Sequence, residues 1–325
     1  MREITFAEAI REALRHEMKL DDKVFIFGED VGAFGGCFGV TAGLFQEFGP
    51  DRVMDTPISE SAILGTALGA ALMGLRPVPE IMFIDFTTVC FDYLTNQAPK
   101  VRYMCGGQVQ KLPLVVRTTS GGWIRAAGQH SQSLEGWFTQ VPGLKVVMPG
   151  TPYDAKGLLL AALRDNNPVL YIEEKALYAT SGPVPEEEYL VPLGQAEVKR
   201  TGKDVTLITY AGMLGHTLAA AETLAGAGID AEVVDLRTLS PLDHDTLAKS
   251  VQKTHKAVVV QEACEMAGVA AQVIKSLVDS SFGYLDAPIK TVAALNTVIP
   301  FSPPLEDITL PSADKVVQAV KALMA

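Results

Sequence analysis

The sequence predicts an α/β protein of two domains, each built on a mostly parallel sheet covered by helices. The chain has 325 residues, which are too many for one ordinary core. Apolar runs of four to eight residues, typical of strands buried on both faces, alternate with segments of helical periodicity. Between residues 181 and 204 the alternation is broken by Pro183, Pro185 and three consecutive glutamates, which indicates a linker.

The first predicted element is an amphipathic helix that begins with a capping box, Thr5-Phe6-Ala7-Glu8. A buried strand is predicted at 24–27, and a glycine-rich segment at 32–39 follows it, where an α/β protein places ligand contacts. The other elements of this half are strands at 79–85, 112–117, 144–148 and 168–173 and helices at 61–75, 91–104, 134–141 and 153–163.

A second and smaller alternation of strands and helices begins after the predicted linker. Its elements are strands at 205–210, 231–236 and 257–261 and helices at 214–225, 244–251, 269–279 and, after a proline-rich tail, 312–324. We therefore assign the first domain to residues 1–185, the linker to 186–203 and the second domain to 204–325.

Composition and charge exclude several classes of protein. With 48% hydrophobic and 20% charged residues the chain is expected to be globular, and its net charge of -11 argues against nucleic acid or an acidic membrane as a partner. The longest uncharged apolar run, 62–75, is shorter than the roughly 20 residues of a membrane span. No targeting segment is recognisable, and four cysteines without CxxC spacing favour a reducing, cytoplasmic setting.

The segment Asp55-Thr56-Pro57-Ile58-Ser59-Glu60 leads into a helix rich in glycine and alanine. Gly65 and Gly69 lie on one face of this helix, and each interior glycine costs about 1 kcal/mol relative to alanine. That pattern predicts close packing of another backbone against this face. Glu60, at the helix start, could simply complement the helix dipole, or it could be a functional acid beside a tight interface.

The loop 121–133 ends near His130, a side chain suited to proton exchange close to neutral pH. His130 could equally cap the next helix or bind a backbone carbonyl. No GxxxxGK[ST], GxSxG or HExxH motif occurs. The GxGxxA match at 226–231 lies between a helix and a strand, the reverse of a dinucleotide site, so a nicotinamide dehydrogenase is poorly supported.

Over nearly its whole length the chain resembles the beta subunit of the thiamine diphosphate-dependent decarboxylating component of 2-oxoacid dehydrogenase complexes, of the pyruvate, branched-chain and acetoin types. This family shares its architecture with transketolase. The resemblance implies a transketolase-like pyrimidine-binding domain followed by a transketolase C-terminal domain. The matching segments are, in chain order, 28–31, 55–60, 129–133, 142–147, 154–158, 165–168 and 234–241.

The resemblance implies a role for four residues around the aminopyrimidine of the cofactor. Thiamine diphosphate supplies an ylide that adds to a ketone and stores the carbanion left when carbon dioxide departs. Glu60 corresponds to the acid that hydrogen-bonds a pyrimidine nitrogen and favours the imino tautomer. Phe86 corresponds to an aromatic ring stacked on the pyrimidine, with Ile58 and Met82 beside it.

Further roles follow from the same resemblance. His130 matches a histidine near the substrate end of the cofactor, where it helps proton transfer or acylation of the lipoyl group. Glu29 matches a second acid near the pyrimidine, which would relay protons between paired sites. A potassium site described in some members corresponds to Leu114, Ala162, Leu163, Asp165 and Asn167.

One absence bears on the assembly. The chain lacks the GDG segment that usually holds the diphosphate through magnesium. An alpha subunit is therefore expected to supply magnesium and the diphosphate contacts, in an alpha2-beta2 heterotetramer that docks a lipoyl acyltransferase core through the C-terminal domain. A self-sufficient transketolase or deoxyxylulose-phosphate synthase relative would need a longer chain.

The expected activity is oxidative decarboxylation of a 2-oxoacid, with pyruvate favoured and acyl transfer to lipoyl. An acetoin or branched-chain enzyme, or a non-catalytic partner subunit of the same fold, are alternatives. The sequence departs from the family pattern at Gly128, at Met266 and at Trp123-Ile124-Arg125, which makes the loop before His130 bulky.

Overall fold

The computed structural model describes residues 1–325 and divides them into two compact units. Unit 1 comprises Met1–Ser120 and Trp137–Leu193, and unit 2 comprises Gly121–Gly136 and Gly194–Ala325. The segment 121–136 thus belongs to unit 2, although both of its flanks belong to unit 1. The boundaries that we assigned to functional domains stay a prediction.

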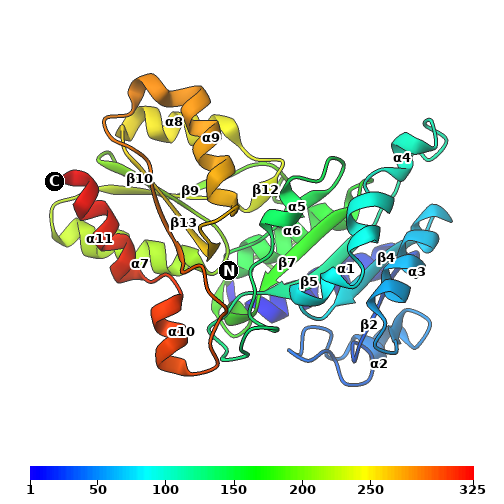
Figure 1. Cartoon of the computed structure of the whole chain (residues 1–325). Coiled ribbons are helices and arrows are strands. Elements are labelled where there is room, and N and C mark those ends of the chain that lie inside the picture. Colours follow the sequence, from blue (N-terminus) through cyan, green and yellow to red (C-terminus); the bar gives the residue numbers. More distant parts are fainter. The chain divides into compact units, whose positions relative to one another are not determined.

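Unit 1 is built on a parallel sheet whose strands lie in the order β6-β7-β5-β4-β2-β3 (Figure 1). A separate antiparallel pair joins β1 to β8. The elements are β1 (Arg2–Thr5), α1 (Phe6–Leu20), β2 (Val24–Gly28), α2 (Leu44–Phe48), β3 (Val53–Asp55), α3 (Glu60–Leu72), β4 (Arg76–Ile81), α4 (Val101–Met104), β5 (Val115–Ser120), α5 (Gly136–Thr139), β6 (Lys145–Val147), α6 (Pro152–Arg164), β7 (Val169–Glu174) and β8 (Ser181–Val184).

The predicted capping box of α1 is confirmed. The Thr5 hydroxyl accepts from the Glu8 amide at 3.2 Å, and the Glu8 carboxylate accepts from the Thr5 amide at 2.7 Å. The apolar face of α1, including Phe6 and Ile10, is fully buried and packs against α6 within the main core of the unit. A helix that is capped and amphipathic in this way can be recognised from sequence alone.

The predicted helix at 91–104 is wrong as a continuous element. The chain there forms a π-helical turn at Tyr93–Gln97 and then the short α4, with Pro99 between them. Proline has no amide hydrogen to donate to the preceding turn, so it interrupts the helical hydrogen bonds, although Ala98 before it keeps helical backbone. The predicted strand 79–85 is shifted as well: β4 ends at Ile81, and Ile84–Thr88 is a 3-10 helix.

Unit 2 is a smaller sheet in the order β14-β13-β10-β11-β9, in which only β9 is antiparallel. Helices α7 and α11 cover one face of this sheet, and α8 and α9 cover the other (Figure 1). The elements are β9 (Glu197–Arg200), β10 (Val205–Thr209), α7 (Met213–Gly226), β11 (Ala231–Asp235), β12 (Thr238–Ser240), α8 (His244–Thr254), β13 (Ala257–Cys264), α9 (Val269–Ser281), β14 (Lys290–Ala294), α10 (Pro303–Thr309) and α11 (Ala313–Met324).

Both sheets are flanked by helices and mostly parallel, which confirms the predicted fold class. The sequence did not reveal β1, β3, β8, β9, β12, β14, α2 or α10. Strands β9 and β14 lie at the edges of the unit 2 sheet and carry few buried residues, so they lack a continuous apolar run. Helix α10 starts with two prolines, which are compatible with a first helical turn but read as a tail in sequence. No helix combines the length and apolar character of a membrane span.

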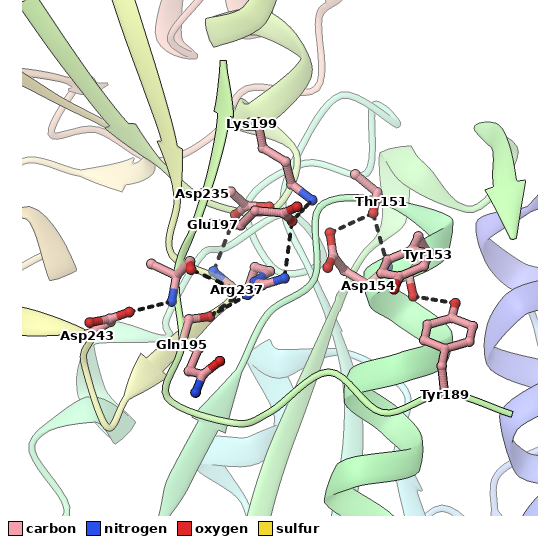
Figure 2. Close-up of polar contacts among 11 residues, drawn as sticks. Thr151, Tyr153, Asp154, Tyr189, Gln195, Glu197, Lys199, Asp235, Arg237 and Asp243 are labelled. Atoms are coloured by element: carbon pink, nitrogen blue, oxygen red, sulfur yellow. Dashed lines mark hydrogen bonds and ion pairs between the residues drawn. The ribbon is translucent and has the colours of Figure 1, made fainter. Parts of the chain in front are cut away.

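The predicted linker 186–203 is divided between the units. Its first part packs on α6 of unit 1: the Val191 amide donates to the Gly157 carbonyl at 3.1 Å, and the Tyr189 ring stacks on Tyr153 with centroids 4.4 Å apart. Figure 2 shows the Tyr189 hydroxyl donating to the Tyr153 carbonyl, at 2.8 Å.

The second part of this segment begins unit 2 and is fixed by Arg237. The Arg237 guanidinium donates to the Gln195 carbonyl at 2.9 and 3.1 Å and pairs with the Glu197 carboxylate at 3.1 Å (Figure 2). The Asp243 carboxylate, which also caps α8, accepts from the Ala196 amide at 2.9 Å. The predicted linker therefore packs against unit 1 before residue 193 and against unit 2 after it, and does not form a flexible linker.

Candidate active site

Glu60 is the first residue of α3, as predicted. The segment before it is tied to the end of β2, because the Thr56 amide donates to the Gly28 carbonyl at 2.9 Å. Ser59 occupies the cap position but makes no side-chain capping bond. The Glu60 side chain is 8% exposed, and its carboxylate has no hydrogen-bond partner within this chain. A buried carboxylate of this kind fits a ligand that brings its own donor.

A second acid lies near Glu60. Burial raises the pKa of Glu29, which directly follows β2, and the negative charges of Glu60, Asp30 and Glu80 raise this pKa further. Glu29 and Glu60 therefore interact electrostatically at the carboxyl ends of the parallel strands, the edge where sheets of this kind hold ligands. The structure thus brings together two of the predicted site residues.

The strands that carry Glu80, Arg117 and Glu173 contain a buried ion-pair network that the sequence did not reveal. Arg117 on β5 is 1% exposed and pairs with Glu80 on β4 and Glu173 on β7, each at 2.6 Å. The Tyr178 hydroxyl donates to Glu173 at 2.7 Å. Burial raises the pKa of Glu80, and Arg117 opposes that rise. The sequence did offer a signal for this network, because charged residues lie inside strands that were predicted to be buried. Such residues are almost never buried without partners.

Met82 and Phe86 follow β4 and are half-buried. The Cys37 thiol lies 3.4 Å from the Met82 sulfur, and burial together with the charges of Asp30, Glu80 and Glu29 raises the pKa of Cys37. Phe86 packs edge-to-face on Phe83, with ring centroids 5.9 Å apart.

Cys90 follows Phe86 by one turn, and its thiol senses the charge of Glu60. The Cys90 thiol donates to the Phe86 carbonyl at 3.9 Å, and burial followed by the charge of Glu60 raises the pKa of Cys90 to about 12. Ile58, by contrast, is 80% exposed on the loop before α3. A large apolar side chain that is exposed beside a buried carboxylate is available to a ligand or a partner subunit.

Within this chain no backbone packs against either glycine of α3, and a neighbouring backbone from an alpha subunit stays a prediction. A Cβ on Gly65 would lie 2.9 Å from the Tyr93 hydroxyl, so an aromatic side chain of the same chain fills that space. Gly69 has nothing within 4 Å of such a Cβ and is exposed. Only Gly69 leaves room for a neighbour from outside the chain.

His130 lies in unit 2, on the segment 121–136, and is half-buried. All other predicted site residues lie in unit 1. The His130 segment contains no regular structure before α5, and three of its non-glycine residues, Trp123, Arg125 and Ala127, have φ between 60° and 68°. Left-handed backbone costs such residues about 1–2 kcal/mol each, so other contacts must hold it.

The residues of the predicted potassium site gather at the end of α6, and basic side chains contact their oxygens. Arg76 donates to the carbonyls of Leu163 at 2.7 Å and Asp165 at 3.4 Å. Burial alone would raise the pKa of Asp165, but hydrogen bonds from Lys145 and Asn167 outweigh burial and lower it. The Leu114 carbonyl accepts from Val169 and that of Ala162 from Asp165. The donor chemistry is oxygen-rich, yet several oxygens already have cationic or amide partners.

Comparison with known proteins identifies both halves of the chain. Residues 2–180 match the family "Transketolase, pyrimidine binding domain", and residues 194–316 match "Transketolase, C-terminal domain". Among solved structures, a split-gene transketolase described as an inactive beta4 tetramer has a TM-score of 0.82, with 23% identity over 99% of this chain and 98% of that one, which supports the fold.

Three curated relatives cover nearly the whole chain. The beta subunit of acetoin:2,6-dichlorophenolindophenol oxidoreductase from Bacillus subtilis strain 168 is 48% identical, over 99% of this chain and 98% of its own. The beta subunit of the pyruvate dehydrogenase E1 component from the same strain is also 48% identical, over 100% and 99%. The corresponding acetoin subunit of Cupriavidus necator is 49% identical, over 99% and 98%.

The fold and the two domain matches define a protein of the transketolase-like class, whose families depend on thiamine diphosphate. Within that class, the chain belongs to the family of E1 beta subunits of pyruvate and acetoin dehydrogenases.

Proposed function

We propose that this chain is the beta subunit of a thiamine diphosphate-dependent 2-oxoacid dehydrogenase, which oxidatively decarboxylates a 2-oxoacid and passes the acyl group to a lipoyl group. Pyruvate is the favoured substrate. The observation that carries the proposal is Glu60, a buried carboxylate at a helix start without a hydrogen-bond partner in its own chain. Two relatives named as acetoin enzymes, at 48% and 49% identity, make acetoin the second candidate substrate.

The residues of unit 1 have distinct tasks in this proposal. Glu60 would hold a ring nitrogen of the pyrimidine and keep a proton there, while Phe86, Met82 and Ile58 would enclose the ring. Glu29, whose pKa is raised by burial and by the charge of Glu60, would relay protons between paired sites. When bound, thiamine diphosphate supplies the nucleophilic carbon and the electron sink.

His130 would accept or donate a proton near the substrate end of the cofactor. The C-terminal domain of this chain would also dock the lipoyl acyltransferase core. An alpha subunit would complete the site in an alpha2-beta2 heterotetramer and would hold magnesium and the diphosphate, since this chain has no GDG segment. A potassium ion would bind near Asp165 and Asn167. The four unpaired cysteines favour a cytoplasmic location.

The test is calorimetric titration of thiamine diphosphate and magnesium into this chain alone and into its complex with the co-expressed alpha subunit. We expect binding by the complex only. Decarboxylation by the complex is then assayed with pyruvate, branched-chain 2-oxoacids and acetoin, using lipoyl domain or dichlorophenolindophenol as acceptor.

The outcomes separate the alternatives. Turnover of one substrate class identifies the enzyme type. A complex that binds the cofactor but turns over none of these substrates would favour a non-catalytic partner subunit. Magnesium-dependent binding by the lone chain would contradict the shared site.

A further inference from the structure

The segment 121–136 carries His130 but has no regular structure to hold that residue in place. Trp123, Arg125 and Ala127 alternate along it in left-handed backbone, with φ of 68°, 61° and 60°. None of the three is glycine, so this conformation is unfavourable by itself. Contacts elsewhere in unit 2 must therefore stabilise it.

The first contact is Glu262, on β13. It is 5% exposed, and one carboxylate oxygen accepts from the Gly122 amide at 2.6 Å. The other oxygen accepts from the Trp123 indole nitrogen at 3.1 Å, and the Ser133 hydroxyl lies 3.4 Å from the first oxygen. A single buried carboxylate thus binds the segment on both sides of His130.

The second contact is Glu306, on α10, which is fully buried. Its carboxylate accepts from the Trp123 amide at 3.0 Å and pairs with Arg125, which also pairs with Asp307 at 2.7 Å. Gly122 is confined by the same group: a Cβ there would lie 3.1 Å from a Glu306 carboxylate oxygen. Charge-assisted bonds of this kind are roughly twice as strong as neutral ones.

The Trp123 ring also makes a stacking contact. It stacks on His216 of α7, with ring centroids 5.0 Å apart and planes at 23°. Burial lowers the pKa of His216, which favours the neutral ring. Trp123 therefore makes a backbone bond to Glu306, an indole bond to Glu262 and a stacking contact, all within unit 2.

We propose that Glu262 and Glu306 are positioning residues, which act through Trp123 and Arg125 to hold the segment 121–136 so that His130 is presented in one orientation. The inference rests on the proposed function, in which His130 exchanges a proton near the substrate. Trp123 and Arg125 are among the residues at which the sequence was read as departing from the family pattern.

The test uses the assembled enzyme with its alpha subunit and four variants: Glu262→Gln, Glu306→Gln, Trp123→Phe and, as matched control, Glu232→Gln. Glu232 is also a buried carboxylate of unit 2, but it pairs with Lys253 and does not contact the segment. Amide hydrogen exchange within 121–136 should become about tenfold faster or more in Glu262→Gln and Glu306→Gln, and should not change in Glu232→Gln. Unchanged exchange in the first two variants would overturn the proposal.

Turnover tests whether the positioning acts through His130. We expect Glu262→Gln to lower kcat by about tenfold to 100-fold with little change in KM. The same change made in a His130→Ala background should lower kcat by less than about twofold, since the group being positioned is already gone. Losses that simply multiply would mean that Glu262 has a merely structural role.

Two further results keep the test decisive. If Glu262→Gln does not assemble, Trp123→Phe decides, because it deletes only the indole donor and keeps an aromatic ring over His216. If His130→Ala retains full turnover, the role proposed for His130 is wrong, and the exchange measurement alone judges whether the two carboxylates hold the segment.

Discussion

Glu60 is a buried carboxylate at a helix start, and no group of its own chain forms a hydrogen bond with it. We expect Glu60→Ala to lower kcat of the complex by about 100-fold or more while the chain folds and assembles normally, because the group lost would act on the cofactor. Steady-state kinetics and size-exclusion chromatography of the complex check this. Ser61→Ala, which removes only a hydroxyl bonded to the Val89 carbonyl, is the control on the same helix turn. Full turnover by Glu60→Ala would disprove the assigned role.

Glu135 makes stability depend on pH. It is fully buried, and burial raises its pKa from the ordinary 4.5 to about 7, although the Tyr210 hydroxyl donates to it at 2.7 Å and opposes the rise. Between those two values the folded chain keeps a proton that the unfolded chain has lost. The contribution of Glu135 to the free energy of unfolding is therefore most favourable below pH 4.5. It falls by about 3 kcal/mol in total as the pH rises from 4.5 through 7.

Urea denaturation at several pH values between 5 and 8 tests this effect. Glu135→Gln keeps an oxygen for Tyr210 but has no proton to lose, so its unfolding free energy should vary less with pH than that of the unchanged chain. Parallel profiles for Glu135→Gln and the unchanged chain would show that Glu135 does not titrate in this range.

Sequence reasoning placed Glu60 at a helix start because the signals are local: a proline turn and a helix-like pattern follow one another within a few residues. The role assigned to Glu60 came from the family resemblance. The partners of Arg117 were not predictable in the same way, because Glu80 and Glu173 come from other strands, 37 and 56 residues away. Glu262 and Glu306 were missed for the same reason, since they bind backbone amides that lie 140 and 183 positions earlier in the chain.

Among the elements, α3 offers a clear contrast between two glycines. Gly69→Ala should stabilise the isolated chain by about 1 kcal/mol, because alanine favours the helix and the space beside Gly69 is open. Gly65→Ala should gain nothing or lose stability, because its Cβ meets the Tyr93 hydroxyl. Thermal unfolding of the two variants of the isolated chain provides the comparison.

The same pair of variants reports on the partner subunit. If the alpha subunit packs on the open face of α3, Gly69→Ala should weaken assembly even though it stabilises the isolated chain. Co-purification with the alpha subunit measures this effect. Equal assembly by the unchanged chain and Gly69→Ala would remove Gly69 from the interface.

At the scale of the whole molecule, the chain passes between the units at residues 120, 136 and 193. A fragment of residues 194–325 would contain the sheet of unit 2 but not the segment 121–136. Tyr210, Glu262 and Glu306 would then lose partners that they have in the full chain, and a buried polar group without its partner costs about 1–3 kcal/mol. We expect this fragment to unfold at lower urea concentration than unit 2 does within the full chain.

A fragment in which residues 121–136 are joined to residue 194 through a flexible linker is the matched comparison. It should recover much of the lost stability, as measured by urea denaturation. A fragment 194–325 that is as stable as the joined one would indicate that the segment contributes little to unit 2.

The placement of residues 121–136 also affects the order in which the protein forms. A chain is synthesised from its N-terminus, and domains tend to fold as they emerge. Every strand of the unit 1 sheet from β2 to β7 is complete by residue 174, whereas Glu262 and Glu306 are added much later. A nascent chain would thus carry His130 for most of its synthesis without the groups that hold it, and an ordered His130 segment would mark a chain that is nearly finished.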